Sequence, residues 1–450
     1  MPAGKGLVRE DFAVRRSNVL TLALASLLAM PAFAQETHAS VAAQPARQHK
    51  ASDSVDLTLD FVGNVAGNPV GGVAQGVEGS YWVMGRAVFD LDALWGWHGW
   101  SLDTQAAWFA GRNLAREKIG SSISAQQTWR PVAGGRLTRF TLTKKFDNGL
   151  SLIAGRTALN SYFNSSPLNC VFMSNAMCLT PYGAITDIGI TAYPNSSWAA
   201  IGRYDINDRV YVQAGVFDYN NDLNVAGKNG VDFSWRDGSG TLSAGEIGYE
   251  TKAGSDPLPR AYRLGVYRNT DGGRNPFYDA SGRSAALTGK ATAMQDGDRV
   301  GWYAMGDQTL WRGKGGRNLA VFGRYFINTG NSAAIKWFGA AGLVKTGTLQ
   351  GRDKDTVALF VSDTHFDPLQ MAFLRDRRIR AGGIGTPHND EVITELAYGI
   401  AVGKGVRVMP NLQYIINPDP IYAPTRTTDI PDALVVGLRL DVHFADLFGW

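Results

Sequence analysis

The stretch "ALVVGLRLDVHF", Ala433 to Phe444, lies six residues from the end of the chain and repeats with a period of two. Its even positions are apolar, its odd positions are small or polar from residue 437 onward, and only Val435 departs from the pattern. Such alternation is typical of a β-strand with one apolar and one polar face. The apolar face would pack on a second sheet in a soluble sandwich, or face lipid in a membrane barrel whose polar face lines a wet lumen. One strand does not distinguish the two.

The same alternation recurs along the chain from residue 55, and Gly- and Asn-containing turns such as "DNG" at 147–149 separate the runs. The polar faces carry full charges, which the interior of a sandwich would not tolerate. The pattern therefore predicts an all-β fold, an antiparallel transmembrane barrel with a polar lumen. Strand parity places six charged residues inside this barrel, where they would lie along the solute pathway: Arg86, Arg139, Glu246, Arg263, Arg324 and Glu395.

Bulk composition agrees with a large barrel. The 450 residues include 53 glycines, 11% are aromatic, 19% are charged, and the mean hydropathy is -0.14. No segment shows a sustained helical period, which argues against a βαβ enzyme, and no later stretch is apolar enough for a transmembrane helix. The near-neutral balance of charges argues against a nucleic-acid partner and against a strongly anion-selective pore.

The N-terminus predicts export. Arg15 and Arg16 precede the apolar stretch "NVLTLALASLLAMPAFA", which ends in a small-residue cleavage site at Ala34. We therefore expect a signal peptide over residues 1–34, a flexible periplasmic leader over 35–52, a barrel over 53–444 and a short extension over 445–450. Removal of the signal peptide would lower the formal net charge from +4 to +2.

Cys170 and Cys178 are the two cysteines, and in an exported chain they predict a local disulfide. They lie in one of five Gly/Asn/Ser-rich pieces that interrupt the alternation, at 62–80, 158–183, 218–240, 268–298 and 415–431. Long connections of a barrel belong on the extracellular side. The 158–183 piece either folds inward and narrows the pore or stays outside it as a stapled surface loop; the sequence leaves both open.

Signatures of catalysis and of cofactor binding are missing from the sequence. The six histidines show no paired metal spacing, and there is neither a G-x-S-x-G elbow nor a Walker A sequence. We therefore expect no enzyme activity, no metal and no cofactor. Trp95, Trp97 and Trp100 in "ALWGWHGW" are interpreted as an aromatic girdle at a membrane interface, with a sugar-stacking platform as the alternative.

Several motifs resemble the carbohydrate-selective porin family, the OprB type, from about residue 53 onward. The most specific is "EVITELAYGIAVGKGVRVMPNLQYIINPDP" at 391–420, with a Glu-bearing strand, a Pro-containing strand and a "QY…NP" end. Four others occur in family order: "SLIAGRTALNSYF" at 151–163, "RYDINDRVYVQAGVFDYNND" at 203–222, "GWYAMGDQTLWR" at 301–312 and "GLVKTGTLQGRDKDTVALFVSDTHF" at 342–366. The chain departs from relatives that carry an extra N-terminal module, and "ADLFGW" follows its last family-like strand.

The resemblance implies a barrel of about sixteen strands in the outer membrane of a Gram-negative bacterium, passing glucose-like monosaccharides by diffusion through a charged, aromatic-lined lumen. Its partners would be sugar solutes, outer-membrane lipid and the barrel-assembly machinery. The resemblance leaves open whether the chain forms a homo-oligomer. Two rivals are a general non-selective porin and an exported β-sandwich sugar-binding protein.

The closing strand admits two registers. Counting back from Trp450 would turn Asp446 toward lipid, whereas counting back from Phe444 keeps the lipid face wholly apolar. We therefore expect Phe444 to end the strand that closes the sheet against the first strand near Val55, with 445–450 as a periplasmic extension.

Overall fold

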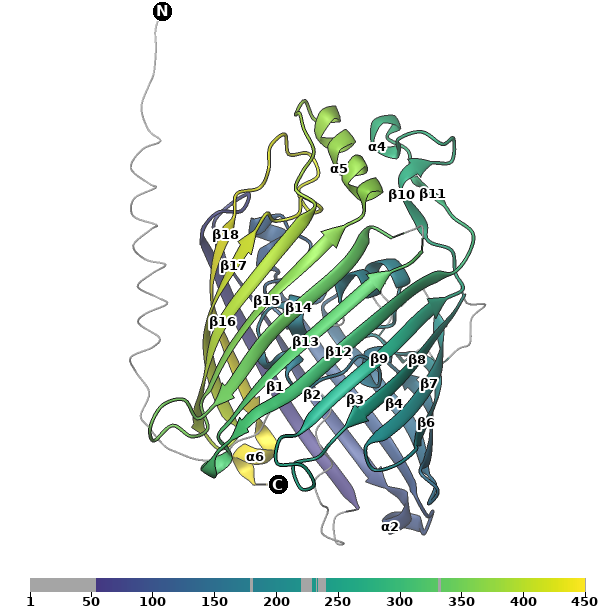
Figure 1. Ribbon diagram of the computed structural model, residues 1–450, viewed down its shortest axis with the longest axis vertical. Coiled ribbons are helices and arrows are strands. Elements are labelled where there is room, and N and C mark those ends of the chain that lie inside the picture. Colours follow the sequence, from purple (N-terminus) through teal and green to yellow (C-terminus); the bar gives the residue numbers. More distant parts are fainter. Residues whose placement is uncertain are drawn as a thin grey trace, which may run out of the picture.

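The computed structural model describes residues 54–449, except 179–180, 220–228, 232, 234–239 and 331–332. The predicted signal peptide, the leader and Trp450 lie outside the described residues. Sixteen antiparallel strands close into one barrel (Figure 1). They are β1 (Val55–Val70), β2 (Val77–Asp90), β3 (Trp100–Gly111), β4 (Gly134–Lys145), β5 (Leu150–Thr157), β6 (Ser197–Asp205), β7 (Val210–Tyr219), β8 (Gly240–Glu250), β9 (Arg260–Asn269), β12 (Arg299–Arg312), β13 (Asn318–Asn328), β14 (Ile335–Thr346), β15 (Thr356–Phe366), β16 (Asp390–Gly403), β17 (Val406–Ile416) and β18 (Ala433–His443).

The barrel closes where β18 pairs with β1. Their register runs from Asp60 opposite His443 to Val70 opposite Leu434. The first strand is thus the predicted partner of the last, but closure begins at Asp60, because Val55 pairs only with β2. Closure leaves no exposed sheet edge, which a membrane-spanning strand requires because lipid offers no hydrogen bonds.

Parity along β18 is as the sequence predicts. Arg439 and Asp441 are 3% and 6% exposed and face the interior, while Val436 and Leu440 are exposed on the outer face. Val435, the one apolar residue on the polar face, is fully buried. It belongs to a cluster of apolar side chains inside the lumen that includes Phe172 and Met173 from the connection between β5 and β6. The exception in the pattern therefore marks a place where the lumen is filled by protein rather than by water.

Connections at the two ends of the barrel differ in length. Strands such as β4 and β5, β6 and β7, and β16 and β17 are joined by short turns at the end that carries α6 (Phe444–Phe448) (Figure 1). The opposite end carries the long connections, including α5 (Pro368–Arg380), α4 (Ala285–Thr288) and the two-stranded ribbon β10 (Arg274–Asp279) and β11 (Thr292–Met294). In outer-membrane barrels the long-loop end is extracellular and the short-turn end is periplasmic.

One expectation about the connections is wrong, and two of the connections were not predicted. Most of the 62–80 piece belongs to β1 and β2, joined by residues 71–76. The long 112–133 connection was not expected at all. α5 is a real helix in the 367–389 connection, capped by Asp367, whose side chain accepts a hydrogen bond from the Leu369 amide. The strand period dominates the sequence, so one helix in an external loop leaves little trace in it.

The outer wall carries large apolar side chains on strands around the barrel. Large side chains such as Leu57, Trp108, Leu264, Leu359 and Leu396 are about half exposed on it. Among the described residues, no helix is both long enough and apolar enough to cross a membrane.

The chain end differs by one residue from the expected boundary. Phe444 is the first residue of α6 instead of the last residue of β18, and its ring stacks on that of Phe448. Phe448 is 69% exposed at the short-turn rim.

Candidate permeation site within the lumen

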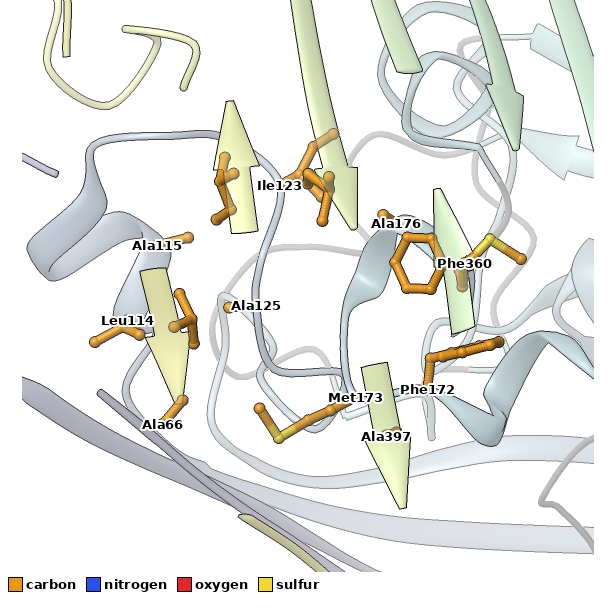
Figure 2. Close-up of a cluster of buried hydrophobic side chains, with 14 of the residues drawn as sticks. Ala66, Leu114, Ala115, Ile123, Ala125, Phe172, Met173, Ala176, Phe360 and Ala397 are labelled. Carbon is orange, nitrogen blue, oxygen red and sulfur yellow. The ribbon is translucent and has the colours of Figure 1, made fainter. Parts of the chain in front are cut away.

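Two segments fold into the barrel from its long-loop end: residues 112–133 between β3 and β4, and, between β5 and β6, the described part of residues 158–196 (158–178 and 181–196), which is called the inward-folded segment below. The second reaches both sides of the wall. Leu159 and Phe163 pack against β6, β7 and β9. Phe172 and Met173 pack against β13, β15 and β18, in the cluster drawn in Figure 2. Of the two positions that the sequence left open, the inward one is observed.

Glu395 on β16 anchors the middle of the 158–196 segment. Its two carboxylate oxygens each accept one backbone hydrogen bond, from the amides of Met173 and Ser174, both at 2.8 Å. The side chain is 0% exposed. A carboxylate that accepts two backbone donors in a buried position fixes the loop in place, and leaves no oxygen facing the channel.

Glu246 on β8 has the same role on the other side of the lumen. It accepts hydrogen bonds from the Asn164 amide at 3.0 Å, from the hydroxyls of Tyr211 and Tyr303 at 2.8 and 2.6 Å, and from the Gln213 amide group at 2.7 Å. Only 5% of this residue is exposed. Its acceptor capacity is thus satisfied by the protein itself.

Arginines complete the attachment of the segment. Arg324 on β13 donates to the carbonyl of Met177 at 2.7 Å, and Arg439 on β18 donates to the carbonyls of Cys170 and Phe172 at 2.8 and 3.2 Å. Cys170 and Cys178 are joined by a disulfide within the same stretch. Wall and segment are therefore held by charge-assisted hydrogen bonds at four places around the lumen.

A buried carboxylate lies in the turn η4 (Ala184–Ile188). Asp187 accepts hydrogen bonds from the Ile335 amide at 2.8 Å and from Asn328 at 3.2 Å, both on the wall. Burial raises the pKa of Asp187 to about 7, because the desolvated charge is only partly compensated by these donors. The docking of this turn is consequently sensitive to protonation near neutral pH.

The remaining predicted lumen residues keep part of their surface accessible. Arg86 and Arg139 both donate to Asp103 on β3, at 2.8–2.9 Å, with side chains 28% and 15% exposed. The guanidinium of Arg139 also lies 5.6 Å from the centre of the Tyr162 ring, which belongs to the inward-folded segment. Charged groups and an aromatic face are thus brought together at one place in the lumen.

Arg263 on β9 lies between two acidic side chains. It is 3.6 Å from carboxylate oxygens of both Glu250 and Asp307, and its side chain is 12% exposed. It also donates to the Tyr211 hydroxyl at 3.1 Å, which links it to the Glu246 cluster.

All six predicted residues face the interior, but in two different settings. Arg86, Arg139 and Arg263 are partly accessible, while Glu246, Arg324 and Glu395 are buried beneath the inward-folded segment. Sequence reasoning missed Asp103, although its odd position on the strand would have placed it inside by the same parity. It also missed Asp187, for which the sequence offers no period or motif. Among the described residues, no group of three or more His, Cys, Asp or Glu side chains is placed to hold a metal ion.

Comparison with known proteins agrees with this architecture. Residues 80–444 match the model of the carbohydrate-selective porin, OprB family. The chain belongs to that family. Porin B of Pseudomonas aeruginosa is 28% identical over 410 residues, which cover 86% of this chain and 87% of the relative. A putative porin, QuiX, of Acinetobacter baylyi is 24% identical over 426 residues, covering 88% and 91%.

A solved structure shares the fold. The high-pH structure of Pseudomonas putida OprB superposes with a TM-score of 0.78 at 28% identity, covering 87% of this chain and 94% of that one. This porin is therefore a sixteen-stranded carbohydrate-selective channel of the Gram-negative outer membrane, and its family implies a channel rather than an enzyme.

Proposed function

We propose that glucose-like monosaccharides diffuse passively through this porin past the Arg86–Asp103–Arg139 cluster and the ring of Tyr162. The observation that carries the proposal is the juxtaposition of a partly exposed charged cluster with an aromatic face from the inward-folded segment. Sugar hydroxyls both donate and accept, so they can exchange hydrogen bonds with water for hydrogen bonds with arginine and carboxylate. The apolar face of a pyranose can stack on the tyrosine ring.

Arg263 on β9 extends the same pathway, where Glu250 on β8 and Asp307 on β12 supply acceptors. The buried residues Glu246, Arg324 and Glu395 act differently in this proposal, since they position the inward-folded segment and do not touch the solute. Cationic and anionic groups alternate along the accessible cluster, which suits an uncharged polar solute better than an ion of either sign.

Single-channel conductance in planar bilayers with titrated glucose tests this pathway. Arg139→Gln and Tyr162→Ala should each weaken the glucose-dependent reduction of ion current several-fold, because each removes one of the two kinds of contact. Arg268→Gln is the matched control, since Arg268 is on β9 but points outward, with a side chain 56% exposed and paired with Asp298. Glucose affinity that is unchanged in both lumen variants would contradict the proposed pathway. Absence of any sugar-dependent change in the wild type would favour a general pore.

A further inference from the structure

A cavity on the outside of the barrel lies at its short-turn rim. It measures ≈ 440 Å³ and is lined by Trp97, His98, Trp100, Leu142 and Lys144. Trp97 and His98 belong to the turn after α2 (Leu91–Trp95), and Trp100 pairs with Lys144 across β3 and β4. Trp100, Leu142 and Lys144 lie on the outward face of their strands, opposite to Asp103 and Thr141 in the lumen, so this cavity is separate from the permeation pathway.

Lys144 lies on the lipid-facing side of β4, where a charged side chain needs contact with water or with polar headgroups. Arg or Lys is costly at the bilayer midplane and tolerated near the interface, so Lys144 places this rim at headgroup level. Its ammonium donates to the His98 carbonyl and lies 5.8 and 5.3 Å from the ring centres of Trp100 and Phe146. The carbonyl accepts one of the three ammonium protons, and the two rings attract the charge without accepting a hydrogen bond, so ammonium protons remain available to an anionic group.

Basic and acidic side chains both adjoin the cavity. His98 contacts the carboxylates of Asp92 at 3.0 Å and of Asp147 at 3.5 Å, and the Asp147 side chain is 94% exposed. Hydrogen bonding to Asp92, followed by that to Asp147, raises the pKa of His98 above its usual range. A lysine ammonium, a histidine held by two carboxylates, and the carboxylates themselves therefore adjoin one aromatic-walled cavity.

Below the charged groups, the outer wall is apolar. Leu142 lines the cavity, and Phe140 on the same strand and Leu152 on β5, opposite Lys144, are 41% and 46% exposed. These side chains form a path from headgroup level toward the middle of the bilayer, as an acyl chain would need.

We infer that this cavity binds the headgroup of a zwitterionic phospholipid, phosphatidylethanolamine. Its phosphate would accept hydrogen bonds from Lys144, its ammonium would lie between the Asp147 carboxylate and the Trp97 ring, and its acyl chains would run along Leu142. Both ring nitrogens of His98 are engaged by Asp92 and Asp147, so His98 holds these carboxylates at the edge of the cavity. The presence of groups of both signs is what favours a zwitterion over an anionic lipid, for which Asp92 and Asp147 would be repulsive. The tryptophans then serve as walls of a lipid site, beyond a general interfacial girdle.

Native mass spectrometry of the full-length porin in mild detergent tests the site. The protein is titrated with phosphatidylethanolamine, phosphatidylglycerol and phosphatidylcholine of matched chains. Phosphatidylethanolamine should be retained preferentially, and Lys144→Gln should lower its bound fraction about tenfold, as expected for loss of one charge-assisted hydrogen bond. Lys145→Gln is the matched control, because this exposed neighbour loses the same charge without lining the cavity.

The outcomes separate clearly. Equal loss in Lys144→Gln and Lys145→Gln, or no retained lipid in the wild type, would overturn the site, and preferential retention of phosphatidylglycerol would overturn the zwitterionic assignment. Heat-modifiable gel mobility verifies that each variant forms a barrel. Should Lys144→Gln fail to assemble, His98→Ala in the exposed turn provides a second test, because it removes the ring that lines the cavity and holds Asp92 and Asp147 beside it, and it should also lower the bound fraction of phosphatidylethanolamine.

Discussion

Removing the Glu395 carboxylate should release the inward-folded segment from the wall while leaving the barrel assembled. In Glu395→Ala, the amides of Met173 and Ser174 lose their acceptors at a position that is 0% exposed. Each buried donor left without a partner costs about 1–3 kcal/mol, so two of them destabilise the docked segment by about 2–6 kcal/mol. Because about 1.4 kcal/mol changes an equilibrium constant tenfold, the docking equilibrium should shift by about 30-fold to 10⁴-fold toward undocked states. In these states water satisfies the freed amides.

The other attachments limit the effect. Arg439 still holds Cys170 and Phe172, and the strand hydrogen bonds of β16 do not involve the carboxylate. We therefore expect local release around residues 172–178, seen as a larger and noisier single-channel conductance and as passage of solutes larger than those the wild type admits.

Planar-bilayer recording of three proteins separates loop release from loss of charge. Glu395→Gln keeps the volume and one acceptor oxygen, so it should behave between wild type and Glu395→Ala. Glu250→Ala removes the same charge from a lumen residue that pairs with Arg203 and Arg263 instead of the segment, and should leave conductance noise unchanged. A quiet Glu395→Ala channel with wild-type conductance and solute cut-off would refute the anchoring role.

Three further predictions concern the loop, its disulfide and the chain end. Burial raises the pKa of Asp187 to about 7, so the protonated form of Asp187 favours the docked state of the inward-folded segment. This contribution to docking is full below about pH 4 and is lost as pH rises through about 7. Channel noise should therefore rise over this pH range in the wild type but not in Asp187→Asn. Cys170 and Cys178 should yield no free thiol in the purified, non-reduced protein, and two titratable thiols would contradict the disulfide. Phe444→Asp in the full chain should impair assembly by the barrel-assembly machinery, whereas a chain ending at Phe444 should still assemble, though more slowly; heat-modifiable mobility measures both, and the reverse result would assign the signal to Trp450.

The inward or outward direction of many side chains in the barrel follows from the period-two alternation in the sequence. Arg439 and Asp441 were placed inside, and Leu440 outside, from the period of two alone, because successive side chains of a strand point to opposite faces and a slip of one residue would put charges into lipid. The same rule placed all six predicted charged residues in the lumen, and the family motifs supplied the number of strands.

Sequence by itself therefore determined which residues face the lumen, and the tertiary structure decided what they do there. Glu395 and Arg139 are equivalent by parity, yet one is buried against amides 221 and 222 residues earlier in the chain, while the other remains partly accessible beside Asp103. Backbone amides carry no side-chain signature, and a segment of irregular structure has no period to fix where it docks. The division between anchoring and solute-facing charges thus depends on contacts between distant parts of the chain, which exist only once the segment has folded into the closed barrel.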